Sequence, residues 1–276
     1  MVSIARLQAY LRHSAQQQYE TVSVPFFTLF FHPTDALTYF NYGIPDEPCS
    51  GGLGSSLSVL RDEFAARGRY PRIEFIQEFA PQLACALRAA GFVEEARQQL
   101  MVCTAETFRP APKVLGLTIT ELTCNLNRPG RSALPASATS EAQDYLTTQR
   151  RGFDARSKKV ATEGDAEQFL RTIGGGRAFV AWLKGQPVGV GMYTTPSDGV
   201  TEIAGLATLE PFRRRGIATR LTALAVQRAM AQGAEVVCLT AADERAGRVY
   251  ERVGFVRYAT MLAYLDSPGC RLSASA

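Results

Sequence analysis

The chain has 276 residues, of which 46% are hydrophobic and 20% are charged, a composition typical of globular proteins that bury a sizeable core. Its formal net charge of +4 is too small to indicate a nucleic-acid partner, although it suits an anionic ligand. The sequence has no signal-peptide pattern and no apolar run near the roughly 18 residues that a membrane-spanning helix needs. We therefore expect a cytoplasmic protein that binds neither membranes nor nucleic acid.

The residues that commonly bind metals are few and scattered. The six cysteines include no pair at C-x-x-C spacing, and the two histidines, His13 and His32, have no companion ligands nearby in the sequence. This usage is typical of reduced thiols in a cytosolic protein. We predict that the protein binds no metal.

Hydrophobic spacing in the first part of the chain predicts alternating helices and strands. The expected helices are 3–19, 57–66 and 81–90, and the expected strands are 21–31, 72–76 and 98–104, with 35–42 compatible with either. Gly91 follows the third helix, where a left-handed residue commonly ends a helix.

The same periodicities continue in the second part of the chain. The expected strands are 117–122, 178–183, 188–194, 202–208, 235–240 and 258–265, and the expected helices are 141–151, 166–173, 217–231 and 244–253. Residues 128–139, rich in proline, serine and alanine, are expected to form a loop, and the small polar tail at 267–276 is expected to fray.

An internal repeat relates the two parts. Aligning Gly91-Phe92 with Gly254-Phe255 superimposes the order helix, strand, helix, Gly-Phe, strand on itself. The match lies in the pattern rather than in residue identity. It predicts two related domains, 1–110 and 111–276, joined near the proline-containing segment 108–112.

Residues 206–219 read Leu-Ala-Thr-Leu-Glu-Pro-Phe-Arg-Arg-Arg-Gly-Ile-Ala-Thr, an apolar strand followed by an arginine-rich turn and a helix. The free N–H groups at a helix start and the helix dipole favour an anion there. Gly216 allows the backbone to approach a ligand closely, and the arginines add positive charge. The segment therefore predicts a pyrophosphate cradle, with a solvated basic loop as the alternative.

Arg213, Gly216 and Ala218 fill the pattern [RQ]-x-x-G-x-[GA], so the segment resembles motif A of the GNAT superfamily of N-acetyltransferases. Residues 249–255, Val-Tyr-Glu-Arg-Val-Gly-Phe, resemble motif B of that family. The resemblance covers 115–265 and is faint over 1–105. It implies a tandem GNAT-like α/β (α+β) fold, whose mixed, mostly antiparallel sheet splays after its fourth strand, is flanked by helices and receives acyl-CoA in the gap.

The resemblance also implies roles for particular residues, with acetyl-CoA as the cosubstrate. Backbone groups of Leu206, Ala207 and Thr208 would pair with the pantetheine arm. The pyrophosphate would be held by Arg213, Arg214, Arg215, Gly216, Ile217, Ala218 and Thr219. Tyr250 stands where the family often has a general acid, and Glu202 where some members carry a general base. The alternatives are a core aromatic for Tyr250 and a solvated strand edge for Glu202. Glu244 replaces an asparagine common in the family, which leaves its contact with the cosubstrate open.

The resemblance thus predicts an N-acetyltransferase that moves an acetyl group from acetyl-CoA to a primary amine of a small molecule or peptide, by direct attack in a ternary complex. A non-catalytic acyl-CoA sensor is the alternative, and a nucleic-acid-binding arginine run is a weaker one. Residues 1–110 would be a degenerate domain, because Leu87 stands where the second half has Tyr250 and the glycine run 51–54 has no arginine ahead of it. The pairs Arg150-Arg151 and Lys158-Lys159 fit a solvated face or an anion site for an acidic acceptor. A homodimer is compatible with such folds.

Overall fold

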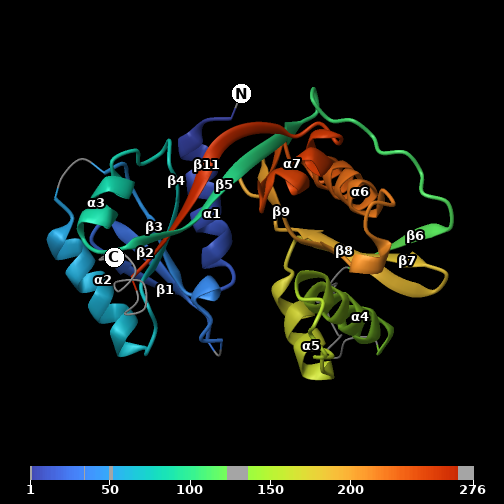
Figure 1. Ribbon diagram of the computed structural model, residues 1–276, viewed down its shortest axis with the longest axis horizontal. Helices are drawn as coiled ribbons and strands as arrows, with labels where there is room; N and C mark the ends of the chain where they lie inside the picture. Colours follow the sequence, from blue (N-terminus) through green and yellow to red (C-terminus); the bar gives the residue numbers. More distant parts are fainter. Residues whose placement is uncertain (1, 34, 50–51, 123–135, 267–276) are drawn as a thin grey trace. The chain divides into compact units, whose positions relative to one another are not determined.

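The computed structural model describes residues 2–33, 35–49, 52–122 and 136–266 (Figure 1). Several predicted features lie wholly or partly outside these residues: the start of the glycine run 51–54, most of the loop 128–139, the tail 267–276, and Cys124 and Cys270. The loop prediction was wrong for residues 136–139, which form the first turn of α4 (Ala136–Phe153). Within the described parts, the chain divides into two compact units. The first comprises positions up to Leu100, Thr240–Asp243 and those from Arg257 onward, and the second comprises Met101–Leu239 and Glu244–Val256.

The first unit contains a sheet with three helices. Its elements are α1 (Ile4–Gln16), β1 (Glu20–Val24), β2 (Phe27–Phe31), η1 (Thr38–Phe40), β3 (Tyr42–Pro45), α2 (Gly54–Ala66), β4 (Arg72–Ile76), α3 (Leu83–Ala89), most of β5 (Val93–Thr104) and most of β11 (Val256–Leu265). Strands β1, β2 and β3 are antiparallel neighbours, whereas β3 and β4 run parallel. Strand β11 pairs antiparallel with β4, from Met261 opposite Ile76 to Leu265 opposite Arg72.

One prediction in this unit was wrong. Residues 21–31 were expected to form a single strand, but they form the β1–β2 hairpin, closed by Val24 opposite Phe27. Pro25 fixes its own backbone angle, and Phe26 adopts a φ of 73°. This is a turn in which the second central residue is usually glycine, so the aromatic residue concealed the turn in the sequence.

The core of the first unit lies mainly between the sheet and helices α2 and α3, which cover one face (Figure 1). Leu57, Leu60 and Phe64 of α2 and Leu87 of α3 belong to this buried cluster. Helix α1 covers the other face, where Ala15 packs with Phe30 and Ile44. Both faces of the strands are therefore buried, which explains why all five residues of Phe27–Phe31 are buried and four of them are apolar.

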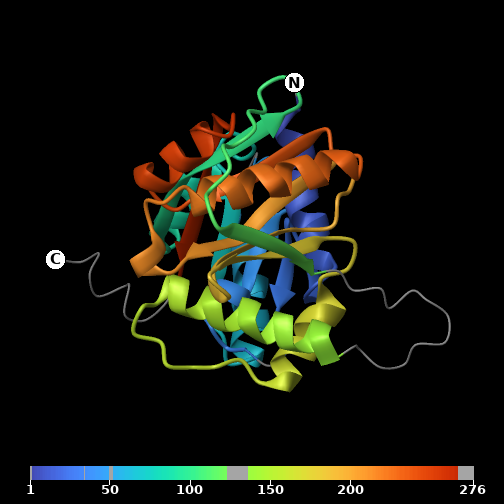
Figure 2. The same cartoon turned by 90° about the vertical axis from the view of Figure 1, so that its right-hand side faces the viewer.

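The second unit is a sheet covered by helices on both faces. Its elements are the end of β5, β6 (Leu117–Leu122), α4 (Ala136–Phe153), α5 (Glu163–Thr172), β7 (Arg177–Leu183), β8 (Gln186–Tyr193), β9 (Val200–Thr208), η2 (Glu210–Phe212), α6 (Ile217–Ala231), most of β10 (Val236–Ala241) and α7 (Glu244–Glu251). Strands β6 to β9 form antiparallel neighbours, and β9 pairs parallel with β10. Helix α6 lies on one face of this sheet and α4 with α5 on the other (Figure 2).

The predicted α/β (α+β) class, with a mixed and mostly antiparallel sheet flanked by helices, is confirmed. Within the described residues, the pairing of β9 with β10 extends only from Val200 opposite Val236 to Glu202 opposite Cys238. Strand β9 nevertheless continues to Thr208, so its last residues leave the partner strand. The sheet therefore splays after its fourth strand, as the resemblance implied.

The same helix ending occurs in both units. The carbonyl oxygen of Leu87 accepts from the amides of Ala90 (3.1 Å) and Phe92 (3.0 Å), with Gly91 at a φ of +89°. The carbonyl oxygen of Tyr250 accepts from the amides of Val253 (2.9 Å) and Phe255 (3.2 Å), with Gly254 at +99°. The repeat seen in the sequence is therefore accompanied by the same two hydrogen bonds at these two helix ends.

Candidate functional site

Strand β9 has an irregular end that precedes the predicted cradle. Strand β8 pairs Val190 with Ala207 but Met192 with Ala204, so the register shifts between these pairs. The extra residue lies at Gly205–Leu206, where Gly205 adopts a left-handed φ of 62°. This is a β-bulge, a feature that redirects backbone groups and often lies next to active sites.

Helix α4 holds this bulge from one face of the sheet. The side-chain amide of Gln149 donates to the carbonyl oxygen of Gly205 (3.3 Å) and to the hydroxyl oxygen of Tyr145 (3.2 Å). Tyr145 is fully buried and stacks on Phe169, with ring centroids 4.7 Å apart and planes inclined by 16°. Burial raises the pKa of the Tyr145 hydroxyl, which therefore stays protonated and serves as a fixed polar anchor.

The cradle itself is built from two left-handed residues and the start of α6. Arg214 has a φ of 62° and Gly216 a φ of 79°, and α6 begins directly at Ile217. No side chain caps Gly216 in the described part of the chain, so the first N–H groups of α6 are left for another acceptor. Alternating left- and right-handed residues before a helix form an anion-binding concavity.

The three arginines of the turn have different surroundings. The Arg213 guanidinium donates to the carbonyl oxygens of Thr208 (3.1 Å) and Gly152 (2.9 Å), so it ties the turn to β9 and to the end of α4. The Arg215 guanidinium lies 5.3 Å from the centroid of the Phe212 ring. Arg214 and Arg215 are exposed to solvent. The side chain of Arg213 thus holds the turn in place, a role that motif matching alone did not predict.

Thr208, the last residue of β9, has an unsatisfied polar group. Its hydroxyl oxygen is buried and has no hydrogen-bond partner among the described residues. Leaving such a group unpaired is unfavourable, by about 1–3 kcal/mol for a typical buried polar group. The orphaned hydroxyl lies on the strand that was predicted to pair with pantetheine.

Glu202 lies on β9 opposite Cys238 of β10, at the last pair before the strands part. Its side chain is half-buried. Burial raises the pKa of the Cys238 thiol well above its usual value, and the Glu202 carboxylate raises it further. Cys238 is therefore a protonated, buried thiol, unsuited to act as a nucleophile.

Tyr250 lies in the last turn of α7 and is half-buried. Its ring packs against Phe255, with centroids 6.1 Å apart and planes inclined by 60°. This contact fits the core-aromatic interpretation at the ring and leaves the role of the hydroxyl to experiment. Thus β9 and the cradle are continuous in the chain, whereas Tyr250 comes from a separate helix.

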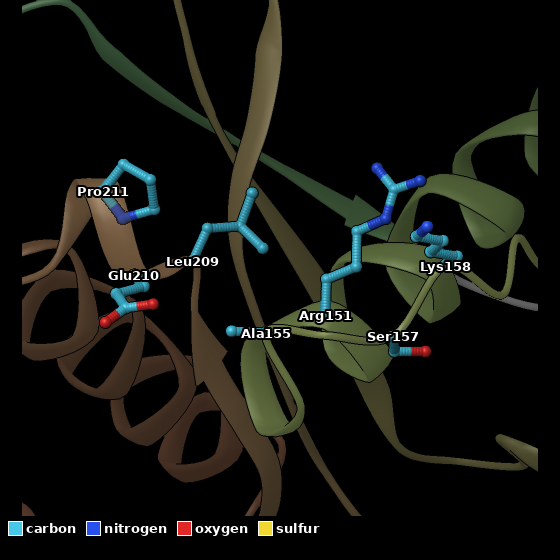
Figure 3. Close-up of a pocket in the computed structure, with 7 residues that line it drawn as sticks. All are labelled: Arg151, Ala155, Ser157, Lys158, Leu209, Glu210 and Pro211. Carbon is cyan, nitrogen blue, oxygen red and sulfur yellow. The ribbon is translucent and has the colours of Figure 1, made fainter.

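A pocket of about 420 Å³ adjoins the start of the cradle. It is lined by Arg151, Ala155, Ser157, Lys158, Leu209, Glu210 and Pro211 (Figure 3). The sequence identified Arg151 and Lys158 as members of two basic pairs, but no pattern in it predicted that residues 151–158 lie beside residues 209–211.

No metal-binding cluster of His, Cys, Asp or Glu occurs in the residues that the structure describes. In the same residues, no helix is long and apolar enough to span a membrane.

Comparisons with known proteins agree with this architecture. Residues 143–255 match the model of the acetyltransferase (GNAT) family. No curated protein matches the chain. Among solved structures, a GCN5-related N-acetyltransferase from Kribbella flavida has a TM-score of 0.75 at 24% identity, covering 99% of both chains. One from Sphaerobacter thermophilus has a TM-score of 0.59 at 16% identity, covering 87% of this chain and 76% of the other.

A tandem GNAT protein from the clavulanic acid biosynthesis pathway has a TM-score of 0.60 at 14% identity, covering 87% of this chain and 78% of the other. At these identities the structures show a shared fold and no more. The predicted tandem GNAT-like fold is thereby confirmed.

Proposed function

We propose that the chain, whose residues 143–255 match the acetyltransferase (GNAT) family model, moves an acetyl group from acetyl-CoA to a primary amine of a small molecule or peptide. The observation that carries this proposal is the uncapped start of α6 behind Gly216, directly after the end of β9 that has left its partner strand. Such a pair of features suits a ligand with an extended amide-containing arm and a pyrophosphate.

The residues present fit acetyl-CoA in two further respects. The unpaired edge of Leu206, Ala207 and Thr208 offers backbone groups to the pantetheine amides, and the orphaned Thr208 hydroxyl would gain a partner. An added Cβ at Gly216 would lie 3.4 Å from Val114 Cγ2, so the glycine keeps the cradle open at a φ that other residues avoid. The amides of Arg214 to Thr219 would hold the pyrophosphate, and Arg213 would keep their turn in position.

Bound acetyl-CoA supplies an acyl group activated as a thioester. Glu202, directly or through water, would accept the proton that the acceptor ammonium must lose before its nitrogen attacks the acyl carbon. As the carbon–sulfur bond breaks, Tyr250 would donate its hydroxyl proton to the departing sulfur. The transfer would be direct, and burial supports this by raising the pKa of the Cys238 thiol well above its usual value, so that this side chain offers no thiolate.

The domain roles, the location and the partners expected from the sequence form part of this proposal. Residues 1–110 would be a degenerate domain without chemistry of its own, and 111–276 would be the catalytic domain. A cytoplasmic location, a possible homodimer and the lack of nucleic-acid, membrane or metal partners remain predictions.

A non-catalytic acyl-CoA sensor is the second candidate, favoured by the packing of Tyr250 on Phe255. Tyr250→Phe keeps this ring contact and removes only the hydroxyl. For an enzyme we expect turnover to fall by about 10²-fold or more with unchanged acetyl-CoA affinity. Absence of turnover in wild type across an amine panel, with acetyl-CoA still bound, would favour the sensor.

Calorimetric titration with acetyl-CoA tests the cradle. Gly216→Glu places a carboxylate where the pyrophosphate would bind, and we expect affinity to fall at least about 100-fold. Gly233→Glu is the matched control, because Gly233 also has a left-handed φ (+95°) but lies beyond the other end of α6, with no atom within 4 Å of an added Cβ. Equal losses in both variants would show that backbone strain, not the cradle, is responsible.

A further inference from the structure

Two cationic side chains of the pocket have no partner among the residues that the structure describes. Arg151 lies in the last turn of α4 and Lys158 in the loop to α5, and neither side chain makes a hydrogen bond or ion pair with any described residue. The adjacent Arg150, by contrast, pairs with Asp165 at 3.1 Å. The basic run is therefore not uniformly neutralised: among the described residues, the side chains of Arg151 and Lys158 are unpaired and line the pocket, whereas those of Arg156 and Lys159 are unpaired and lie outside it.

The pocket is polarised. Figure 3 shows Arg151 and Lys158 on one side and Glu210 on the other, with Leu209 between them. Two like charges that share a wall repel each other, and an anion bound between them relieves this repulsion. A guanidinium and an ammonium together suit a carboxylate or phosphate. Glu210 disfavours an anion on its own side and so directs it toward Arg151 and Lys158.

The cationic wall is fixed to the strand of the proposed site. An added Cβ at Gly152, the residue after Arg151, would lie 2.7 Å from Ala207 Cβ, so the end of α4 packs closely on β9. The carbonyl oxygen of Gly152 also accepts from Arg213. Leu209, which lies between the two charged sides of the pocket, directly follows Thr208. A ligand in the pocket would therefore adjoin whatever binds along residues 206–208.

We propose that Arg151 and Lys158 form an anion subsite that binds an acidic group, carboxylate or phosphate, of a ligand of the acyltransferase site. The proposal rests on the proposed function. The acidic group has two possible sources: the ribose phosphate of acetyl-CoA, or an acid group on the amine acceptor. Whichever of these two substrates carries the acidic group would need its negative charge to bind tightly.

The test compares two double variants of equal charge change in the full-length chain. Arg151→Gln/Lys158→Gln removes the cations of the pocket. Arg156→Gln/Lys159→Gln removes two exposed cations of the same loop that do not line it. Calorimetry measures the affinity for acetyl-CoA and for 3′-dephospho-acetyl-CoA. Thiol release measures kcat/KM for amines in matched pairs, glutamate against glutamine and glycine against glycinamide.

If the cofactor phosphate is the source, the pocket variant weakens acetyl-CoA binding by about tenfold and leaves the dephospho form unchanged. If the acceptor is the source, acetyl-CoA affinity is retained, while kcat/KM falls by about tenfold for the acids and not for the amides. Glu210→Gln should shift the same quantity in the opposite direction, because it removes a repelling charge. The control variant should change neither quantity by more than about twofold.

The subsite is overturned if the pocket and control variants behave alike. It is also overturned if the pocket variant affects acid and amide amines equally and affects both forms of acetyl-CoA equally. An amine panel without turnover, combined with unchanged affinity for both cofactor forms, also counts against it. These results leave the proposed function standing wherever wild type binds acetyl-CoA and Gly216→Glu does not. Failure of wild type to bind acetyl-CoA would instead overturn the proposed function itself.

Discussion

The side-chain amide of Gln149 donates to the carbonyl oxygen of Gly205, and so helix α4 holds the β-bulge of β9 across a separation of 56 residues in the chain. The bulge decides which way the backbone groups of Leu206 and Ala207 point. Gln149 is accordingly a positioning residue for the strand to which we assign the pantetheine arm.

Gln149→Leu keeps the size of the side chain and removes the hydrogen bond to the bulge. We expect acetyl-CoA affinity to fall about three- to tenfold, with a loss of about 1 kcal/mol in the free energy of unfolding. Gln143→Leu is the control, since Gln143 on the same helix donates to the carbonyl oxygen of Ala161 at 3.4 Å, away from the bulge. Calorimetry and urea unfolding distinguish the two, and a similar affinity for both variants would argue against positioning by Gln149.

Gly205→Ala should be strongly destabilising. The added Cβ would lie 2.3 Å from Gln149 Nε2 at a left-handed φ, and we expect a loss of about 2–3 kcal/mol in the free energy of unfolding. In a Gln149→Ala background, the same change should lower the free energy of unfolding by less, because the clash with the Gln149 side chain is gone and only the backbone strain remains. Gly185→Ala, at a φ of +75° with no atom within 4 Å, reports that strain alone. If the double variant lost as much free energy of unfolding as the two single variants together, the proposed clash between residue 205 and Gln149 would be contradicted.

The two repeated helix ends should differ in their tolerance of alanine. At Gly91 an added Cβ meets no atom within 4 Å, so Gly91→Ala carries only the strain of its φ, about 1 kcal/mol. At Gly254 the Cβ would lie 1.9 Å from the carbonyl oxygen of Thr107, so the backbone must move. We expect Gly254→Ala to lower the midpoint of thermal unfolding much further than Gly91→Ala, and equal midpoints would refute the close packing on residue 107.

Arg213→Lys should weaken acetyl-CoA binding although the charge is kept. A lysine cannot reach the carbonyl oxygens of Thr208 and Gly152 in the fixed fork of a guanidinium, so the turn is held less firmly. We expect affinity to fall about tenfold, compared with little change for Arg220→Lys one turn into α6. Equal affinity of Arg213→Lys and wild type, by calorimetry, would mean that the positive charge alone matters.

Cys238→Ala should retain most of the turnover. Since burial keeps this thiol protonated at neutral pH, it takes no part in direct transfer, and kcat should stay within about threefold of wild type. A modest loss of stability, about 1 kcal/mol, is expected from the small cavity. Loss of activity beyond that of a matched, equally destabilised Cys103→Ala variant would point to a covalent step.

Sequence patterns predicted the elements whose signals are local. Strands β4 and β6 and helix α6 have the predicted bounds, because an apolar period, a glycine or a proline marks each end. The cradle could also be predicted, since one continuous segment contains it. The roles of Gln149 and Gly152 could not be predicted from the sequence, because each depends on contacts with residues more than 50 positions away in the chain. Gly205 offered a weak signal, a glycine inside a strand.

The pairing of β11 with β4 determines when the sheet of the first unit can be completed during translation. During synthesis, residues 1–100 leave the ribosome long before residues 257–265, which fill the edge of β4. Until then the first unit has an unfinished sheet, and the buried face of Leu262 and Tyr264 is missing from its core. Completion of this sheet therefore waits for residues 257–265, and until they are made a nascent chain would expose the open edge of β4 to chaperones.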